Sequence, residues 1–205
     1  RGFGNSEGTP RQLYSMINQL EDLSAAIDYA RQREEINPEK IALWGTSAAG
    51  GYGLIKASED KRIACIIGQC PALDSKADGK MALERQGMGF FLKMFMHAQR
   101  DKGRSRFGLS AHKIPIVARE GEFAFLNAKG AYEGYSSLVD ETFVNEVCAR
   151  SLFELSKNPV SFAREVECPV LLLICEQDNL VSEKSYKNAV NILGELATVK
   201  TYPIG

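Results

Sequence analysis

The sequence has no excess of charge of either sign. Its 205 residues include 25 Lys and Arg against 26 Asp and Glu, which leaves a net charge of −1 at pH 7. Nucleic acids and anionic membranes attract proteins with a basic surplus, so this balance favours neither partner. We therefore expect no nucleic-acid binding.

Long hydrophobic runs are missing as well. The longest, Val170 to Cys175, is far shorter than the ~20 apolar residues that a membrane-spanning helix requires. The hydrophobic fraction of 44% is nevertheless sufficient for the core of one domain of this length. The sequence therefore predicts a single domain over residues 1–205 and no membrane span.

Cysteine is scarce and shows no pairing pattern. The five cysteines are odd in number and include no C-x-x-C pair, which argues against a zinc site or a disulfide framework; they are Cys65, Cys70, Cys148, Cys168 and Cys175. Cys65 and Cys175 lie inside apolar segments, so we expect buried thiols there. Free thiols are typical of a reducing compartment, and we expect a cytoplasmic protein.

Phosphate-binding signatures are also absent. The segment Arg1–Gly8 is rich in glycine, but it has neither the ending of a P-loop nor the G-x-G-x-x-G spacing after a visible strand. We interpret it as the exit from a strand that precedes Arg1. Because the first residue is Arg rather than Met, and because Gly205 directly follows a strand-like stretch, we expect this sequence to be a fragment of a longer protein.

The most informative stretch that is present covers residues 41–51. Ile41–Trp44 predicts a short buried strand, and Gly51 to Ser58 predicts a helix. A serine among small residues between a strand and a helix is the context of a nucleophile elbow, a sharp turn that holds the hydroxyl clear of the backbone. We predict that Ser47 is a nucleophile and that the Ala48 N–H donates to an oxyanion.

The elbow motif departs from the strict pattern G-x-S-x-G, because its last position is Ala49. The alternative is that Ser47 only caps the helix that starts at Ala48, since serine is a favoured N-cap residue. The strand–turn–helix context favours the nucleophile.

Strand and helix signals alternate around this stretch. Arg62–Gln69 predicts the next strand, and this spacing is typical of a parallel α/β unit with a right-handed crossover. Val170–Cys175 has the unbroken apolar run of an interior parallel strand. Glu183–Leu193 predicts a helix with Ser182 as its N-cap, and Ala197–Tyr202 predicts a last strand.

Two further helices are predicted from periodicity. Thr9-Pro10, with Gln12 as the partner in a capping box, predicts a helix that continues to about Arg33. Phe143 to Ser156 predicts another amphipathic helix.

The α/β alternation stops between Cys70 and Glu167, which predicts a helical lid or cap over residues 70–167. Within it, Met81–Gln99 predicts a helix rich in Met and Phe, which is either packed core or a lid over an apolar substrate. The charged stretch Arg100–Arg106 is interpreted as a solvated loop. On the lid alternative, the candidate substrate contacts are Met88, Phe91, Phe95 and Met96.

Together, Arg1–Gly8, Ile41–Ser47 and the strand that leads to Asp178 resemble the α/β-hydrolase superfamily. Ile114–Val117, followed by Gly121–Ala124 and Gly134-Tyr135, is similar to a narrower group of dienelactone-hydrolase-like esterases, which includes fungal polyketide transferases and thiohydrolases. The resemblance covers nearly the whole chain.

This resemblance implies an α/β-hydrolase fold with a lid inserted between the strands that carry Ser47 and Asp178. It implies a Ser-His-Asp triad in which Ser47 is the nucleophile, Asp178 is the acid and the Ala48 N–H is one oxyanion donor. Chain order in this fold is serine, acid, histidine, so the histidine is expected beyond Gly205. The second oxyanion donor is expected before Arg1.

Other residues of the sequence could supply the acid or the base. Glu176 and Asp74 are rivals for the acid, and the position of Asp178 after a parallel strand favours it over both. The two histidines of the sequence, His97 and His112, both precede Asp178, which is the wrong order for the base.

The expected function is that of a serine hydrolase that cleaves a carboxylic ester or thioester through an acyl-enzyme on Ser47, with no metal and no organic cofactor. A small-molecule ester or thioester is the expected partner, and a homodimer is possible. Alternatives are an acyltransferase or an X-Pro-type peptidase on the same fold, and a catalytically inactive binding module. Without the base, the fragment itself is expected to be inactive.

Overall fold

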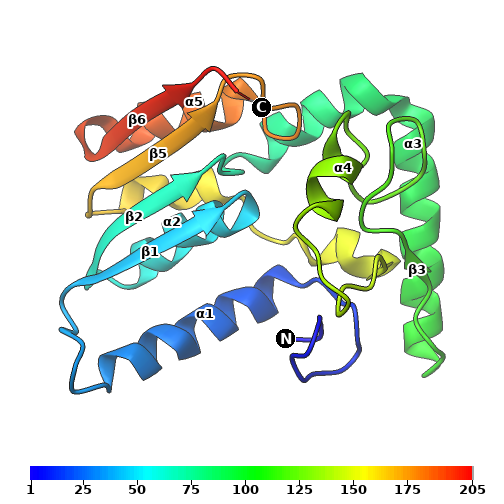
Figure 1. Cartoon of the computed structure of the whole chain (residues 1–205), viewed down its shortest axis with the longest axis horizontal. Coiled ribbons are helices and arrows are strands. Elements are labelled where there is room, and N and C mark those ends of the chain that lie inside the picture. The colour runs from blue at the N-terminus through cyan, green and yellow to red at the C-terminus, as the bar shows by residue number, and fades with distance from the viewer. Residues whose placement is uncertain (205) are drawn as a thin grey trace. The chain divides into compact units, whose positions relative to one another are not determined.

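A four-stranded parallel sheet organises the part of the chain that carries Ser47 (Figure 1). Its strands are β1 (Ile41–Thr46), β2 (Ile63–Gln69), β5 (Val170–Cys175) and β6 (Ala197–Tyr202), in the spatial order β1-β2-β5-β6. Every pairing within this sheet is parallel. The predicted α/β class is therefore confirmed.

The register of this sheet aligns the C-terminal ends of its strands. Thr46 pairs with Gln69, Gln69 with Leu173, and Leu173 with Lys200. The loops that follow β1, β2 and β5 consequently leave from the same edge of the sheet, where functional groups of parallel sheets gather.

The computed structural model describes residues 1–204 and divides into two compact units. The first, which we call the insert unit, comprises Arg1–Gln19 and Gln86–Ser156. The second, the sheet unit, comprises Leu20–Arg85 and the chain from Lys157 onward. Within residues 1–204, no helix has both the length and the apolar character that crossing a bilayer requires.

The bounds of the insert unit are narrower than the expected insertion over residues 70–167. Both flanks of that range belong to the sheet unit, because they bond to each other. The Asn158 side chain accepts from the Ser75 N–H at 2.9 Å and donates to Asp74 Oδ1 at 2.9 Å. The Val160 N–H donates to the carbonyl of Leu73, which is fully buried in the core of the sheet unit.

Besides most of α1 (Met16–Arg31) and the start of α3 (Ser75–Arg106), further helices pack around the core of the sheet unit. They are α2 (Ala48–Glu59), the short 3-10 helix η2 (Pro159–Glu165) and α5 (Glu183–Leu193), which a further 3-10 turn, η3 (Gly194–Leu196), joins to β6. Their apolar side chains share one buried cluster with the strands, including Leu54, Ile66, Leu73, Val170, Leu172 and Ala189. The predicted bounds of α5 are confirmed, and the Ser182 side chain caps it by accepting from the Ser185 N–H.

The N-terminal helix begins later than the capping-box prediction placed it. Helix α1 covers Met16–Arg31, and Thr9-Pro10 lies in the loop before it. The cause is Gln12, whose φ of 65° is incompatible with a right-handed helix. Its side-chain amide donates to the carbonyls of Val144 and Glu146 at 2.9 and 2.8 Å, so its partner is a loop segment distant in sequence and not a helix N-terminus.

The predicted helix over Phe143–Ser156 is wrong. This segment forms β4 (Val147–Cys148) and the 3-10 helix η1 (Ala149–Glu154). Strand β4 pairs with β3 (Lys113–Ile114), and the Cys148 N–H donates to the carbonyl of Gln12 at 2.7 Å. These long-range bonds use backbone groups that a helix would pair locally.

The charged stretch Arg100–Arg106 is helical, not the predicted loop, because it ends α3 (Ser75–Arg106). Asp101 on this turn is fully buried and well paired. Its carboxylate accepts from the His112 N–H at 2.7 Å, from the Arg150 N–H at 3.0 Å and from the Arg150 guanidinium at 2.9 Å. These donors fix the last turns of the helix to the segments beside it in the insert unit, which also contains α4 (Ala131–Ser136).

Helix α3 is interrupted at Gly87, whose φ of 77° and ψ of 163° are not helical. A side chain in this region of backbone space costs about 1–3 kcal/mol. Gly87→Ala should therefore lower the free energy of unfolding by about 1–3 kcal/mol, measured by urea denaturation.

The matched control is Gly89→Ala, two residues further along the same helix. A Cβ at Gly89 meets nothing within 4 Å, as at Gly87, but the Gly89 φ is not positive. This variant should raise the unfolding free energy by about 0.5–1 kcal/mol, because alanine loses less backbone entropy than glycine. Equal stability of the two variants would contradict the assignment of the break to Gly87.

Candidate active site

Ser47 occupies a strained turn between β1 and α2. Its φ of 55° and ψ of −124° fall in a region that residues other than glycine rarely adopt. The Ser47 side chain is exposed, and it makes no capping hydrogen bond to α2. The alternative in which this serine serves as a helix cap is therefore not supported by the geometry.

Backbone hydrogen bonds hold this turn in place. The Ser47 N–H donates to the carbonyl of Gln69 at the end of β2, at 3.0 Å. The Ser47 carbonyl accepts from the N–H groups of Gly50 at 3.1 Å and Ala72 at 3.0 Å. The strained conformation is thus maintained from both the helix and the adjacent strand.

The small residues of the motif are needed where strand and helix approach most closely. A Cβ on Gly45 would lie 2.5 Å from the carbonyl carbon of Ala49, and a Cβ on Gly50 would lie 2.6 Å from Cβ of Pro71. Ala49 itself is exposed, so its methyl group is accommodated. This explains how the chain departs from G-x-S-x-G at Ala49 without losing the turn.

Ala48 is the first residue of α2. The first N–H groups of a helix have no acceptor within the helix, and the helix dipole adds positive potential at that end. The Ala48 N–H, next to the Ser47 hydroxyl in sequence, is therefore suited to donate to a negatively charged oxygen.

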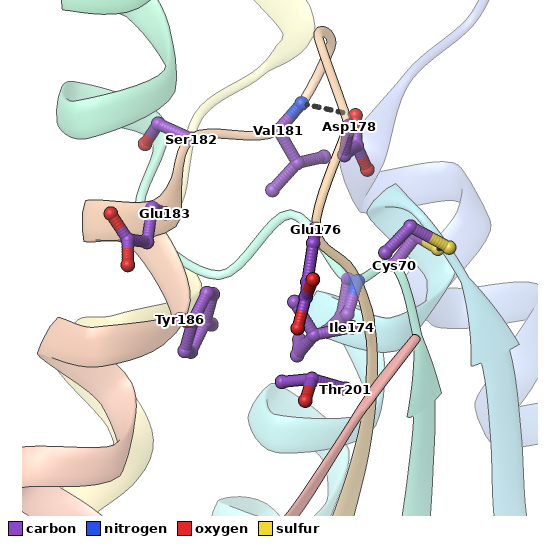
Figure 2. Close-up of a pocket in the computed structure, with 11 residues that line it drawn as sticks. Cys70, Ile174, Glu176, Asp178, Val181, Ser182, Glu183, Tyr186 and Thr201 are labelled. Carbon is purple, nitrogen blue, oxygen red and sulfur yellow. Dashed lines mark hydrogen bonds between the residues drawn. The ribbon is translucent and has the colours of Figure 1, made fainter. Parts of the chain in front are cut away.

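Asp178 lies in the turn that follows β5, and its side chain is half-buried. Its Oδ1 accepts from the Leu180 N–H at 2.8 Å and from the Val181 N–H at 3.0 Å. Figure 2 shows the bond from Val181. The Asp178 N–H donates to the carbonyl of Cys175 at 3.3 Å. These bonds orient the carboxylate through one oxygen and leave Oδ2 without a hydrogen-bond partner among residues 1–204.

The rival acids have different surroundings. Asp74 is only 7% exposed, and its oxygens accept from the Asn158 and Asn188 side-chain amides at 2.9 and 2.7 Å. Burial opposes ionisation of Asp74, but these hydrogen bonds outweigh it and hold the pKa of Asp74 below its ordinary value. Glu176 is exposed at the end of β5. Both oxygens of Asp74 therefore accept hydrogen bonds from side chains within the protein, whereas Asp178 accepts through Oδ1.

Ser47 and Asp178 follow strands that are separated by one other strand. Ser47 follows β1, Asp178 follows β5, and β2 lies between these strands. Two strand spacings place the two backbones about 10 Å apart, which is more than an imidazole ring with a hydrogen bond at each end can span. The Ser47 and Asp178 side chains would therefore have to extend toward each other to hold such a ring between them.

A pocket of about 380 Å³ opens beside Asp178 within the sheet unit (Figure 2). Its size falls in the lower range of small-molecule sites. Its walls combine carboxylates with apolar and hydroxyl side chains, contributed by Cys70, Pro71, Ile174, Cys175, Glu176, Asp178, Val181, Ser182, Glu183, Tyr186 and Thr201.

The two histidines bond to each other in the insert unit. His97 Nδ1 and His112 Nε2 are 2.8 Å apart, and their rings are stacked with centroids 5.0 Å apart. Burial lowers the pKa of both rings, and the neighbouring charges of Lys93 and Arg100 lower the pKa of His97 further. Arg100 also lowers the pKa of His112.

The candidate substrate contacts Met88, Phe91 and Phe95 also lie in the insert unit. Met88 is 69% exposed and Phe95 is 45% exposed, whereas Phe91 is half-buried. Phe95 packs edge-on against Phe153, and Phe91 does so against Phe90. Their roles toward a substrate remain a prediction.

Sequence reasoning missed one feature of this edge. Cys70 has a φ of 43°, and its sulfur lies 3.0 Å from that of Cys175. The two cysteines are far apart in sequence, and only the pairing of β2 with β5 brings them together. No spacing rule in the sequence indicates this pair.

Comparison with known proteins places the chain among α/β-hydrolases. The model of a family described as serine aminopeptidase, S33, matches residues 1–205. The quorum-quenching protein AidA of Acinetobacter baumannii is 37% identical over 188 residues, which cover 90% of this chain and 60% of AidA. The thiohydrolase aneE of Aspergillus aculeatus is 41% identical over 75 residues, which cover 37% of this chain and 24% of aneE.

A solved structure agrees with the fold. The crystal structure of the α/β-hydrolase GrgF from Penicillium superposes with a TM-score of 0.78 at 22% identity, over 98% of this chain and 68% of that one. The chain thus spans 60% of the length of AidA, and less of aneE.

The histidine pair predicts a pH-dependent loss of stability. Because both folded-state pKa values are lowered, the neutral rings stabilise the fold at pH values above the ordinary histidine pKa of about 6.5. This contribution is lost as the pH falls through the lowered pKa values. The test compares the parent with the double variant His97→Gln/His112→Gln, and the unfolding free energy of each is measured by urea titration at pH 7.5 and at pH 5. We expect the drop in unfolding free energy between these pH values to be about 1 kcal/mol smaller in the double variant, because it has no hydrogen bond between histidine rings to lose.

Lys93, Arg100, Asp101 and Arg104 are the charged groups that influence these rings, and all of them are retained in the double variant. A pH dependence that is unchanged in the double variant would show that the pair does not titrate with folding.

Proposed function

This chain belongs to the α/β-hydrolase family described as serine aminopeptidase, S33, and from that premise we propose that the whole protein is a serine hydrolase that cleaves carboxylic ester or thioester bonds. The observation that carries the proposal is the backbone of Ser47, which is strained, exposed and free of any capping role. A thiohydrolase among the relatives supports the thioester class.

In the proposed reaction, Ser47 Oγ attacks the carbonyl carbon of the substrate. A histidine outside this chain, which we expect beyond Gly205, takes the hydroxyl proton, and Asp178 Oδ2 accepts from that imidazole and orients it. The Ala48 N–H donates to the carbonyl oxygen as negative charge develops on it. The histidine then protonates the departing alcohol or thiol, which leaves an acyl group on Ser47.

Water completes the proposed cycle by attacking the acyl carbon while the same histidine removes its proton. No step of this cycle requires a metal or an organic cofactor. If an acceptor other than water attacks, the protein is an acyltransferase, which is the second candidate. An X-Pro peptidase on the same fold is a further alternative, for which the description of the family gives some support.

The non-enzymatic alternative is a hydrolase fold that serves only as a binding module. Strained backbone at a residue other than glycine persists only where its surroundings impose it. A module that only binds does not require a strained backbone at Ser47. The proposal of an enzyme is favoured for this reason.

The acid is tested in the full-length protein by Asp178→Asn. The asparagine Oδ1 can still accept from Leu180 and Val181, so the fold should be retained. Turnover of p-nitrophenyl esters should fall by about four orders of magnitude, because the histidine loses its orienting partner, and Ser47→Ala should lose on the order of a million-fold.

Asp74→Asn is the matched control for the acid. The new NH₂ group at this position would face an amide donor of Asn158 or Asn188, so a hydrogen bond would be lost. The free energy of unfolding should therefore fall by about 1–3 kcal/mol, and the protein that remains folded should keep its turnover. Full activity in Asp178→Asn, with loss in a stable Asp74→Asn, would transfer the role of the acid to Asp74.

We also propose that Met88, Phe91 and Phe95 contact the acyl group of the substrate. The support is that Met88 and Phe95 are large apolar side chains with much of their surface outside any core. Each buried methylene contributes about 0.8 kcal/mol, so these contacts should favour long acyl chains over acetyl.

The test replaces Phe91 and Phe95 by alanine in the full-length protein. The ratio of kcat/KM for octanoyl over acetyl p-nitrophenyl esters should fall about tenfold or more, with acetyl turnover nearly unchanged. Phe90→Ala is the structural control, because Phe90 packs on the buried core of the insert unit. Phe90→Ala is expected to destabilise the fold. If the Phe91→Ala/Phe95→Ala variant unfolds in the same way, Phe91 and Phe95 are part of the core, and the proposed contact with substrate is wrong.

A further inference from the structure

Two cysteines meet at the edge of the sheet that carries the candidate site. Cys70 directly follows β2 and Cys175 is the last residue of β5, the strand paired with β2. The Cys70 N–H donates to the carbonyl of Leu173 at 2.8 Å, which fixes the two chain segments side by side. Their sulfur atoms lie 3.0 Å apart, as free thiols in hydrogen-bonding contact.

This dithiol is partly accessible, unlike the thiols of Cys148 and Cys168. Cys70 and Cys175 are half-buried, and both line the pocket beside Asp178, where Figure 2 shows the Cys70 side chain. Cys148 and Cys168 are buried. The expectation that Cys65 and Cys175 are buried thiols is therefore wrong, because both are half-buried.

The dithiol also stands between the two parts of the candidate site. On one side, the carbonyl of Gln69, the residue before Cys70, accepts from the Ser47 N–H. On the other side, the carbonyl of Cys175 accepts from the Asp178 N–H. A displacement of either cysteine is passed on through one backbone hydrogen bond to the nucleophile or to the acid.

We propose that Cys70 and Cys175 are an oxidation site, at which a peroxide converts the two thiols into a reversible disulfide that slows the reaction at Ser47. The effect on turnover rests on the proposed function, whereas the formation of the disulfide does not. Disulfides of this kind in reducing compartments are typically transient and redox-sensing.

The chemistry balances with one peroxide per disulfide. The sulfur of Cys175, deprotonated, attacks one peroxide oxygen and forms a sulfenic acid, and the second oxygen leaves as hydroxide, which takes up a proton to become water. The sulfur of Cys70 then attacks the sulfenic sulfur, a second water leaves, and the disulfide is complete. Two thiols are oxidised, and hydrogen peroxide is reduced to two waters.

The surroundings suit this division of roles. The pKa of Cys70 is raised to about 12. Burial is the largest cause, followed by the hydrogen bond and charge of Cys175 and then by the charge of Asp178. We therefore assign Cys70 as the thiol that keeps its proton and acts second, as the resolving thiol, once the sulfenic acid has formed.

Closing the bond requires movement at the strand ends. The sulfur atoms must approach from 3.0 Å to about 2.0 Å, and we expect rotation of the two side chains and displacement of the ends of β2 and β5 to share this movement. A misplacement of about 1 Å in a catalytic constellation can cost on the order of a hundredfold in rate. We therefore expect turnover to fall tenfold to about a hundredfold on oxidation.

The experiment treats the reduced full-length protein with hydrogen peroxide, alkylates the remaining thiols and maps tryptic peptides by mass spectrometry. Trypsin should release residues 63–76, which contain Cys65 and Cys70, and residues 165–184, which contain Cys168 and Cys175. The variant Cys65→Ser/Cys168→Ser leaves one cysteine in each peptide. We expect these two peptides to be cross-linked, with the loss of two hydrogens, and to separate again on treatment with dithiothreitol.

Cys70→Ser and Cys175→Ser are the matched controls. Each should give no cross-link. Cys175→Ser should show the same ester turnover with and without peroxide, whereas the parent loses turnover and regains it with dithiothreitol. Absence of the cross-link, a cross-link through Cys65 or Cys168, or irreversible sulfinic acid in its place would overturn the proposal. A cross-linked protein with unchanged turnover would overturn the regulatory part.

An error in the proposed function can be told apart from an error in the proposed disulfide. If the protein is not a serine hydrolase, the reduced protein shows no ester turnover that depends on Ser47, and the peptide map alone decides whether the disulfide forms.

Discussion

The hydrogen bond from the Ser47 N–H to the carbonyl of Gln69 is the interaction on which the candidate site depends. It joins the end of β1 to the end of β2 at the point where the chain turns into α2. Without this bond and the bond from Ala72 to the Ser47 carbonyl, a serine with a φ of 55° would relax toward ordinary backbone space. The close approach of Gly45 to Ala49 belongs to the same constraint, because a side chain at Gly45 would push the helix away from the strand.

The alignment of the strand ends extends this constraint across the sheet. Because Gln69, the last residue of β2, pairs with Leu173, strand β5 continues only through Ile174 and Cys175 before its own loop begins at the same edge. Cys70, Cys175 and Asp178 are brought to one edge by this register, although more than a hundred residues separate the first from the other two in sequence. The pocket beside Asp178 is lined by all three. The position of the site is therefore a consequence of parallel pairing, and its chemistry is a consequence of the residues at the loop starts.

Local signals predicted the parts of the fold whose partners are close in sequence. The apolar run of β5, the Ser182 cap of α5 and the strand–turn–helix around Ser47 all depend on residues within a few positions of one another. Predictions were wrong where distant partners decide. Gln12 is held by the carbonyls of Val144 and Glu146, and Val147 pairs with Ile114, so neither segment is helical. The contact of Cys70 with Cys175 has the same origin, since no property of either local sequence indicates the other.

The surroundings of three carboxylates close to this edge explain why residue type alone does not identify the acid. Asp74 has both oxygens engaged by side-chain amides. Asp78 accepts from Ser182 and from the Ser185 hydroxyl, and burial, only partly offset by these bonds, raises the pKa of Asp78 above its ordinary value. The Ser185 hydroxyl also accepts from the Asp74 N–H, so Asp74 and Asp78 are fixed in one internal network.

Asp178 is oriented through one oxygen only, and it faces a pocket. An acid that must accept from a histidine needs this combination of a fixed direction and an unused oxygen, and of the three carboxylates only Asp178 has both.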